Sequence, residues 1–221
     1  MLKNTNYELR TLTFIDSIQP QLVEFIAADE TGNTVSHPSE YDAALVLEVA
    51  PAMEIHSLVD AALKRTGVRL GCFVTERRYG LMHVHHANQG EVKEAGRAVL
   101  QAMNLEENDR AKMQIVTNKI IRSVESDHAA MFNCSSRSNK VLPGESVLIM
   151  ETTPAAYLGV ACNEALKAAR IKLIHLELTG ASGRLIMSGP ESEIDSAAQA
   201  AKGVLDKLNE MQANKSSRQL A

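Results

Sequence analysis

The segment from His83 to His86, with the sequence HVHH, carries the side chains most able to do chemistry. Alternate residues of a strand point to the same face, so His83 and His85 would present two imidazoles side by side. That spacing suits zinc or nickel, but a catalytic zinc site takes three protein ligands, and no third ligand stands nearby. We therefore expect strand-edge histidines with ordinary hydrogen bonds, and neither a metal site nor a catalytic residue.

Other signatures of enzymes are missing from the sequence. It contains no nucleophile elbow, Walker loop or dinucleotide-binding fingerprint, and residues 180–183 form only a short glycine-containing turn between two expected strands. The three cysteines, Cys72, Cys134 and Cys162, form no C-x-x-C pair, so they indicate buried reduced thiols rather than disulfides or zinc ligands. The sequence predicts a protein that is not an enzyme and needs no cofactor.

Composition and charge narrow the class further. The chain has 221 residues, a net charge of −4, 45% hydrophobic residues and 4% aromatic ones, which indicates an aliphatic core. No basic block marks a nucleic-acid binder, and no apolar run approaches the roughly 20 residues that span a membrane. The polar N-terminus lacks the apolar centre of a signal peptide. We expect a cytoplasmic protein that binds neither nucleic acid nor membrane.

An internal repeat organises the chain. At a constant spacing of 103 residues, Glu48 aligns with Glu151 and Gly80 aligns with Gly183. The same spacing pairs Pro51 with Pro154, and Ala62, Leu63 and Lys64 with Ala165, Leu166 and Lys167. A period near 100 residues is too long for a solenoid unit, so it indicates two tandem copies of one small domain.

Each copy has the local pattern of a strand, a helix, two strands and a second helix. The first strands, at residues 43–50 and 146–153, are rich in Val, Leu and Ile, and each precedes a proline that suits the first turn of a helix. A further strand or hairpin is expected at the start of each copy, before Asp16 and before Glu125. Helices on one face of an antiparallel sheet predict an α+β fold.

A charged stretch without an apolar face, residues 104–112, marks the joint between the copies. We place the first domain at residues 1–107 and the second at residues 108–211. The remaining residues, 212–221, form a polar tail.

Four stretches of the chain resemble the tandem-domain, circularly permuted shell proteins of bacterial microcompartments, and those of carboxysomes in particular. They are LRTLTFIDSIQPQL from Leu9, TERRYGLMHVHHANQGEVKEAGRAVL from Thr75, IIRSVESDHAAMFN from Ile120 and METTPAAYLGVACNEALKAA from Met150. The resemblance runs over nearly the whole chain. It implies two ferredoxin-like shell domains, each permuted, and a location in a microcompartment shell.

The resemblance also implies a homotrimer whose six domains form a pseudohexameric disc. A closed threefold rotation would place one loop of each chain at the axis. In the family, a Glu-Arg pair on the first-copy loop gates the central pore; that pair is Glu76 and Arg77 here, followed by Arg78. The matching loop of the second copy carries the small residues Thr179, Gly180, Ala181 and Ser182. Arginine has planar cationic donors, so we expect small anionic metabolites in the pore.

Two lysines complete the expected contacts. Lys64 and Lys167 occupy matching helix positions, and the resemblance places them at the edge of the disc, against neighbouring hexameric shell proteins. The sequence leaves open whether two trimers stack and whether the compartment is a carboxysome or a catabolic one. It also leaves a competing class, a soluble trimeric ligand-binding regulator, because small α+β repeats often form trimeric sensors.

Overall fold

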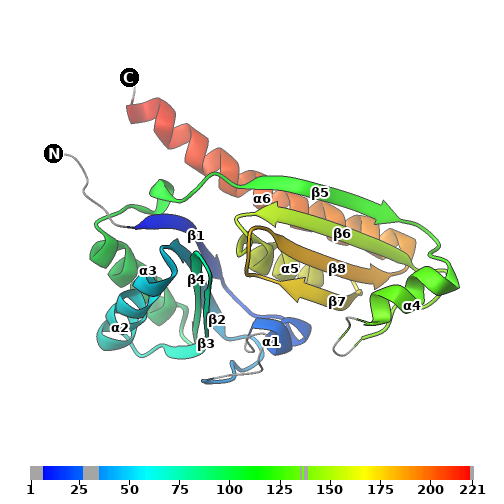
Figure 1. Ribbon diagram of the computed structural model, residues 1–221, viewed down its shortest axis with the longest axis horizontal. Coiled ribbons are helices and arrows are strands. Elements are labelled where there is room, and N and C mark those ends of the chain that lie inside the picture. The colour runs from blue at the N-terminus through cyan, green and yellow to red at the C-terminus, as the bar shows by residue number, and fades with distance from the viewer. Residues whose placement is uncertain (1–6, 27–34, 135, 137–138, 220–221) are drawn as a thin grey trace. The chain divides into compact units, whose positions relative to one another are not determined.

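The computed structural model describes residues 7–26, 35–134, 136 and 139–219, and Figure 1 shows their elements. The chain divides into two compact units. The first comprises Met1–Lys112 with Met211–Ala221, and the second comprises Met113–Glu210. Each unit holds one four-stranded sheet with helices, and the last helix, Glu191–Gln219, begins in the second unit and ends in the first.

The first unit is a four-stranded antiparallel sheet with the order β1-β2-β4-β3. Its elements are β1 (Glu8–Ile15), α1 (Pro20–Ile26), β2 (Ala43–Ala50), η1 (Ala52–Glu54), α2 (Ile55–Arg65), β3 (Arg69–Glu76), β4 (Tyr79–His86), α3 (Gln89–Met103) and η2 (Glu107–Asp109).

The second unit repeats this arrangement with the order β5-β6-β8-β7. Its elements are β5 (Gln114–Ile121), α4 (Ser126–Cys134), β6 (Ser146–Thr153), α5 (Tyr157–Ala168), β7 (Lys172–Glu177), β8 (Gly183–Gly189) and α6 (Glu191–Gln219). Both units therefore have the α+β architecture that the strand and helix pattern predicts.

The joint and the tail differ in detail from the expected boundaries. The first unit extends past residue 107 to Lys112, because η2 and the bond from the Ala111 N–H to the Leu9 carbonyl (2.8 Å) hold this stretch against β1. Residues 212–219, expected as part of a polar tail, continue α6 as helix.

Strand β2 is mostly apolar because side chains on both of its faces are buried. Leu45 and Leu47 point into the core under α2 and α3, whereas Val46 points to the opposite face of the sheet, and all three are almost fully buried. Alternating side chains of a strand face opposite sides, so a strand buried on both sides loses the polar alternation of an exposed sheet.

Matching hydrogen bonds show that the repeat extends to structural detail. The Glu91 carboxylate accepts a bond from the Gly67 N–H at 2.6 Å, and the Glu193 carboxylate accepts one from the Arg170 N–H at 2.6 Å. In each unit, a glutamate in the first turn of the last helix binds a backbone N–H two residues before the third strand. The one-residue change of register between these pairs is the indel in the sequence alignment.

Two sequence expectations about local structure were wrong. Pro51 is extended (φ −68°, ψ 156°) and precedes the 3-10 turn η1, so helix α2 begins only at Ile55. Pro154 likewise precedes a turn, and α5 begins at Tyr157. The positions of the helices are right, but neither proline lies in a first helical turn.

Helices α1 and α4 were not anticipated at all. They contain seven and nine residues, which is too short for a 3.6-residue apolar period to stand out from noise. The available signal is Pro20 as the first residue of α1, a position at which proline is favoured.

Candidate functional site

The expected pore residues of the first unit lie in the hairpin between β3 and β4. Glu76 ends β3 and pairs with Tyr79, which begins β4, so Arg77 and Arg78 form a two-residue turn. Both arginines are exposed, and Arg77 has a positive φ of 51°. Glu76 is half-buried, and its Oε2 atom has no hydrogen-bond partner among the described residues.

The expected pore residues of the second unit lie in the matching hairpin, between β7 and β8. Gly180 has a φ of 90°, a backbone conformation that glycine adopts without steric cost. The Thr153 hydroxyl donates to the Ala181 carbonyl at 3.1 Å, and the Ser182 hydroxyl bonds to the Glu151 carboxylate. The structure thus brings the four small residues, from Thr179 to Ser182, into one loop.

A charged cluster in the first unit supports the base of its hairpin. The Arg10 Nε donates to Glu48 Oε1 at 2.8 Å and its Nη1 donates to Glu8 Oε1 at 3.2 Å. The guanidinium of Arg10 lies 3.8 Å from the centre of the Tyr79 ring, and Arg78 Nη2 lies 3.5 Å from Glu8 Oε2. We call these five residues the hairpin cluster.

The electrostatics of the hairpin cluster favour a permanent ion pair. Only 9% of the Arg10 side chain and 2% of the Glu48 side chain are exposed. Burial lowers the pKa of the Arg10 guanidinium, but the hydrogen bond and charge of Glu48 outweigh this effect and raise that pKa above its ordinary value.

The two lysines expected at a disc edge lie in the last turns of corresponding helices. Lys64 in α2 pairs with Asp60 at 2.7 Å, and Lys167 in α5 pairs with Glu164 at 2.8 Å. Their exposure differs: 74% of the Lys64 side chain is exposed, against 27% for Lys167. The lysines are therefore alike in position but not in accessibility within one chain.

The histidine segment lies on β4, an interior strand, so the expectation of strand-edge histidines was wrong. The rings of His83 and His85 do share a face and stack 5.6 Å apart. His85 lies 3.0 Å from Asp42 Oδ2 and 3.1 Å from the Ser36 hydroxyl, which ties the segment before β2 to the sheet. His86 is half-exposed and accepts a bond from the Asn88 N–H.

His83 differs from His85 and His86 in its hydrogen bonding. It is 1% exposed, and neither ring nitrogen has a hydrogen-bond partner among the described residues. Burial, with a smaller contribution from His85, lowers the pKa of His83 to about 3. The ring therefore stays neutral at physiological pH, and a charged form is strongly disfavoured in the folded protein.

The cysteines are reduced, but only two of them are buried. Cys72 and Cys162 lie in the interior, and burial raises the pKa of the Cys162 thiol far above its ordinary value. Cys134, at the end of α4, is exposed, so the expectation of a buried thiol was wrong there. Ala129 and Phe132 of α4 join a hydrophobic cluster, whereas Cys134 lies at the end of the helix, where its thiol donates to the Ala130 carbonyl at 3.4 Å.

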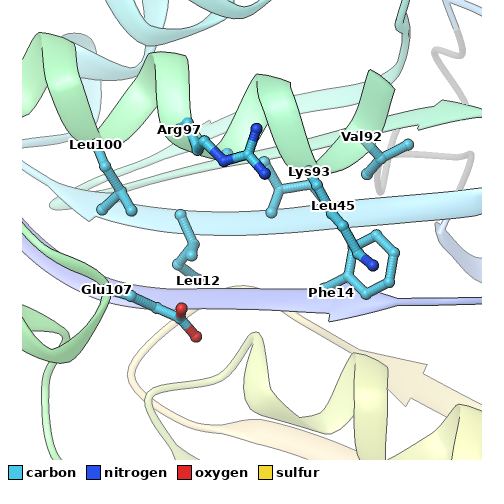
Figure 2. Close-up of a pocket in the computed structure, with 9 residues that line it drawn as sticks. Leu12, Phe14, Leu45, Val92, Lys93, Arg97, Leu100 and Glu107 are labelled. Atoms are coloured by element: carbon cyan, nitrogen blue, oxygen red, sulfur yellow. The ribbon is translucent and has the colours of Figure 1, made fainter. Parts of the chain in front are cut away.

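A pocket of about 320 Å³ lies in the first unit between α3 and strands β1 and β2. Figure 2 shows its apolar floor, formed by Leu12, Leu45 and Phe14, with Lys93 and Arg97 along the helix above. The Lys93 ammonium lies 5.2 Å from the centre of the Phe14 ring. Glu107 also lines the pocket, which does not include the β3–β4 hairpin.

The part of the chain that the structure describes contains neither a cluster of metal-ligating side chains nor a membrane-spanning helix. No group of three or more His, Cys, Asp or Glu side chains there could hold a metal ion. None of the described helices is both long and apolar enough to cross a membrane.

The hairpin cluster was not predicted from the sequence. Arg10, Glu48 and Tyr79 come from three strands, and 38 residues separate Arg10 from Glu48. One signal was present in the sequence: Glu48 aligns with Glu151 in the repeat, although an acidic residue is unusual inside an apolar strand.

Comparison with protein families gives two matches that together cover most of the chain. Residues 9–109 match the CsoS1D N-terminal domain, and residues 146–216 match the BMC domain. The carboxysome shell protein CsoS1D of Hydrogenovibrio crunogenus is 45% identical over 202 residues, which are 91% of this chain and 97% of that protein. The carboxysome shell protein CcmP of Synechococcus elongatus is 42% identical, over 91% of this chain and 93% of that protein.

Solved structures agree with these matches. The fused permuted hexameric shell protein MSM0275 from the RMM microcompartment has a TM-score of 0.86 and 36% identity, over 91% of this chain and 98% of that one. The double ringed trimeric shell protein MSM0271 from the same microcompartment has a TM-score of 0.85 and 30% identity, over 90% and 96%. These similarities favour a shell protein over a soluble regulator. The chain belongs to the family of carboxysome shell proteins that includes CsoS1D and CcmP, and its two units match tandem, permuted microcompartment shell domains.

Proposed function

We propose that three copies of this chain form a closed pseudohexameric disc in a carboxysome-like shell, with a gated pore at the threefold axis. The observation that carries the proposal is the placement of two different loops in matching hairpins, Glu76–Arg78 in one unit and Thr179–Ser182 in the other. A threefold axis would alternate three charged loops with three small ones. The role is structural, and the chain catalyses no reaction.

The gate would consist of ion pairs between neighbouring chains. Within one chain, the buried Glu76 Oε2 has no hydrogen-bond partner and the exposed Arg77 makes no ion pair with a described residue. If the half-buried Glu76 side chain turns outward, pairing with the Arg77 of a neighbouring chain satisfies both groups and closes the axis. An exposed ion pair contributes only about 0–1 kcal/mol, so open and closed loops lie close in free energy.

The chemistry of the loops favours small anions as cargo. A ring of three Arg77 guanidiniums attracts carboxylates and phosphates, for which the planar fork of donors is well suited. The residues Gly180 and Ala181 of the alternate loops occupy little volume and leave room for the charged loops to move. Small anionic metabolites such as sugar phosphates are the class we assign to the pore.

Replacing both Glu76 and Arg77 by alanine is expected to leave a stable trimer whose axial pore is permanently open, because both members of the closing pair are lost. Cryo-electron microscopy of the purified assembly measures the opening. The matched control is the double alanine variant of Arg122 and Glu191, an exposed pair 2.7 Å apart in the second unit. A closed axis in the loop variant would contradict the gate.

The lysines at the ends of α2 and α5 would contact neighbouring discs, including those of hexameric shell proteins. Replacing Lys64 and Lys167 by glutamate is expected to abolish extended two-dimensional layers in electron micrographs while the trimer persists in analytical ultracentrifugation. The control is Lys202→Glu, which reverses another exposed lysine, paired with Asp206 at 2.6 Å. Normal layers from the double variant would refute the edge role.

A further inference from the structure

The turn of the first hairpin holds an arginine where the repeat places a glycine. Arg77 corresponds to Gly180, and the two residues have φ values of 51° and 90°. Side chains with a Cβ rarely adopt this left-handed region, whereas glycine adopts it freely. The first hairpin therefore carries a local conformational strain that the second hairpin avoids, and something in the first unit must hold the turn in place.

The hairpin cluster is in the right place to do so. Arg10 reaches across from β1, and its guanidinium covers the ring of Tyr79 at 3.8 Å while its Nε is fixed by the buried carboxylate of Glu48 at 2.8 Å. Tyr79 is the residue that pairs with Glu76 and closes the turn. Arg78, inside the turn, reaches back to Glu8 at 3.5 Å. The contacts thus fix the turn from its base and from its tip.

The second unit serves as an internal comparison, because it lacks this arrangement. The strand irregularity that contains Arg10 recurs in β5, where Val116 occupies its place and is 56% exposed. Glu151, the counterpart of Glu48, accepts from the Thr117 hydroxyl at 3.4 Å, just as Glu48 accepts from the Thr11 hydroxyl at 3.5 Å. The difference is that Glu151 bonds to the Ser182 hydroxyl, whereas Glu48 bonds to Arg10. Arginine at the strand irregularity and a strained, non-glycine turn therefore occur together in one unit, and both are absent from the other.

We propose that Arg10 is a positioning residue for the Glu76–Arg77 loop: held by Glu48 and stacked on Tyr79, it keeps the turn in its left-handed conformation and so sets the resting state of the gate. The inference rests on the proposed gate, since Arg10 acts on the pore only through this loop. Arg10 itself is buried within the chain. Arg10 therefore controls how readily the loop departs from the conformation seen here, rather than what the pore admits.

The test is hydrogen exchange of the assembled protein, followed by mass spectrometry of peptides from the two hairpins, residues 74–82 and 177–185. Arg10→Val, which introduces the residue of the second unit, is expected to speed exchange in the first peptide at least tenfold and to leave the second unchanged. Adding Arg77→Gly to Arg10→Val should restore slow exchange, because glycine needs no support at a positive φ. Tyr79→Ser keeps the Arg10–Glu48 pair and should reproduce the effect even where Arg10→Val fails to fold.

Three results would overturn the proposal. They are unchanged exchange in the first hairpin of a folded Arg10→Val or Tyr79→Ser variant, equal acceleration in both hairpins, and acceleration that persists after Arg77→Gly. Equal acceleration in both hairpins would mean that Arg10 contributes only to general packing. Fast exchange that persists after Arg77→Gly would mean that Arg10 does not act through the strained turn. Hydrogen exchange measures the stability of the loop, whether or not the loop gates a pore. The gate itself is tested separately, by the axial opening of the variant in which Glu76 and Arg77 are replaced by alanine.

Discussion

Lowering the pH from 7 to 4 is expected to reduce the free energy of unfolding by about 3 kcal/mol through His83 alone. The pKa of this buried ring is lowered to about 3, against an ordinary value of 6.5 that the unfolded chain recovers. Between these values the unfolded state binds a proton and the folded state does not. Stability from the neutral ring is therefore complete above pH 6.5 and is lost at about 1.4 kcal/mol per pH unit as the pH falls toward 3.

The measurement is urea unfolding at fixed protein concentration across this pH range, for the wild type and for His83→Phe. Phenylalanine keeps a ring of similar size in the stack with His85 but cannot be protonated, so the difference between the two pH profiles isolates His83 from the carboxylates. His86→Phe is the control, because His86 is half-exposed and hydrogen-bonded to the Asn88 N–H. Parallel profiles for the wild type and His83→Phe would show that burial of His83 does not govern its protonation.

Gly80→Ala is expected to destabilise the protein by about 3 kcal/mol, near the upper end for an overpacked site. A Cβ atom at Gly80 would lie 2.4 Å from the Ala52 carbonyl oxygen and 2.8 Å from the Ile55 Cβ, so β4 and η1 would have to separate. Gly183→Ala should cost a similar amount, since its Cβ would lie 2.4 Å from the Ala155 carbonyl oxygen. The same close approach at the same spacing explains why both copies keep glycine there.

Gly203→Ala is the matched control for both glycine variants. Gly203 lies within α6, and a Cβ there would meet no atom within 4 Å, so alanine should stabilise the helix by about 1 kcal/mol. Urea unfolding under one set of conditions compares the three variants. If Gly80→Ala changed the free energy of unfolding by no more than Gly203→Ala does, the turn after β2 would have moved to accommodate the added Cβ atom, and the close contact would not explain the glycine.

The repeat was the part of the fold that could be predicted best. A spacing of 103 residues pairs Glu48 with Glu151 and Gly80 with Gly183, and the structure gives each pair the same place in its sheet. Long apolar strands and helices carry a strong local signal, so their positions followed from periodicity. The prediction failed where the local signal was weak, as in α1 and α4. It also failed at Pro51 and Pro154, because a proline after a strand is compatible both with a first helical turn and with an extended residue before a turn.

The site could be predicted only in outline. The turn at Arg77 follows from the repeat, but its positive φ depends on how two strands meet, which no local pattern records. Burial of His83 without a partner likewise depends on β4 being an interior strand rather than an edge. Contacts such as Arg10 with Glu48 join strands distant in the sequence, and a single sequence does not reveal such pairs.

The most direct test of the account is a cryo-electron microscopy map of the purified full-length protein. We expect a ring of three chains and six domains, with Glu76–Arg78 and Thr179–Ser182 alternating around one threefold axis, whether one ring or two stacked rings are present. A discrete assembly of another symmetry, or a trimer whose β3–β4 and β7–β8 hairpins lie at its periphery, would contradict the assignment of these loops to a central pore.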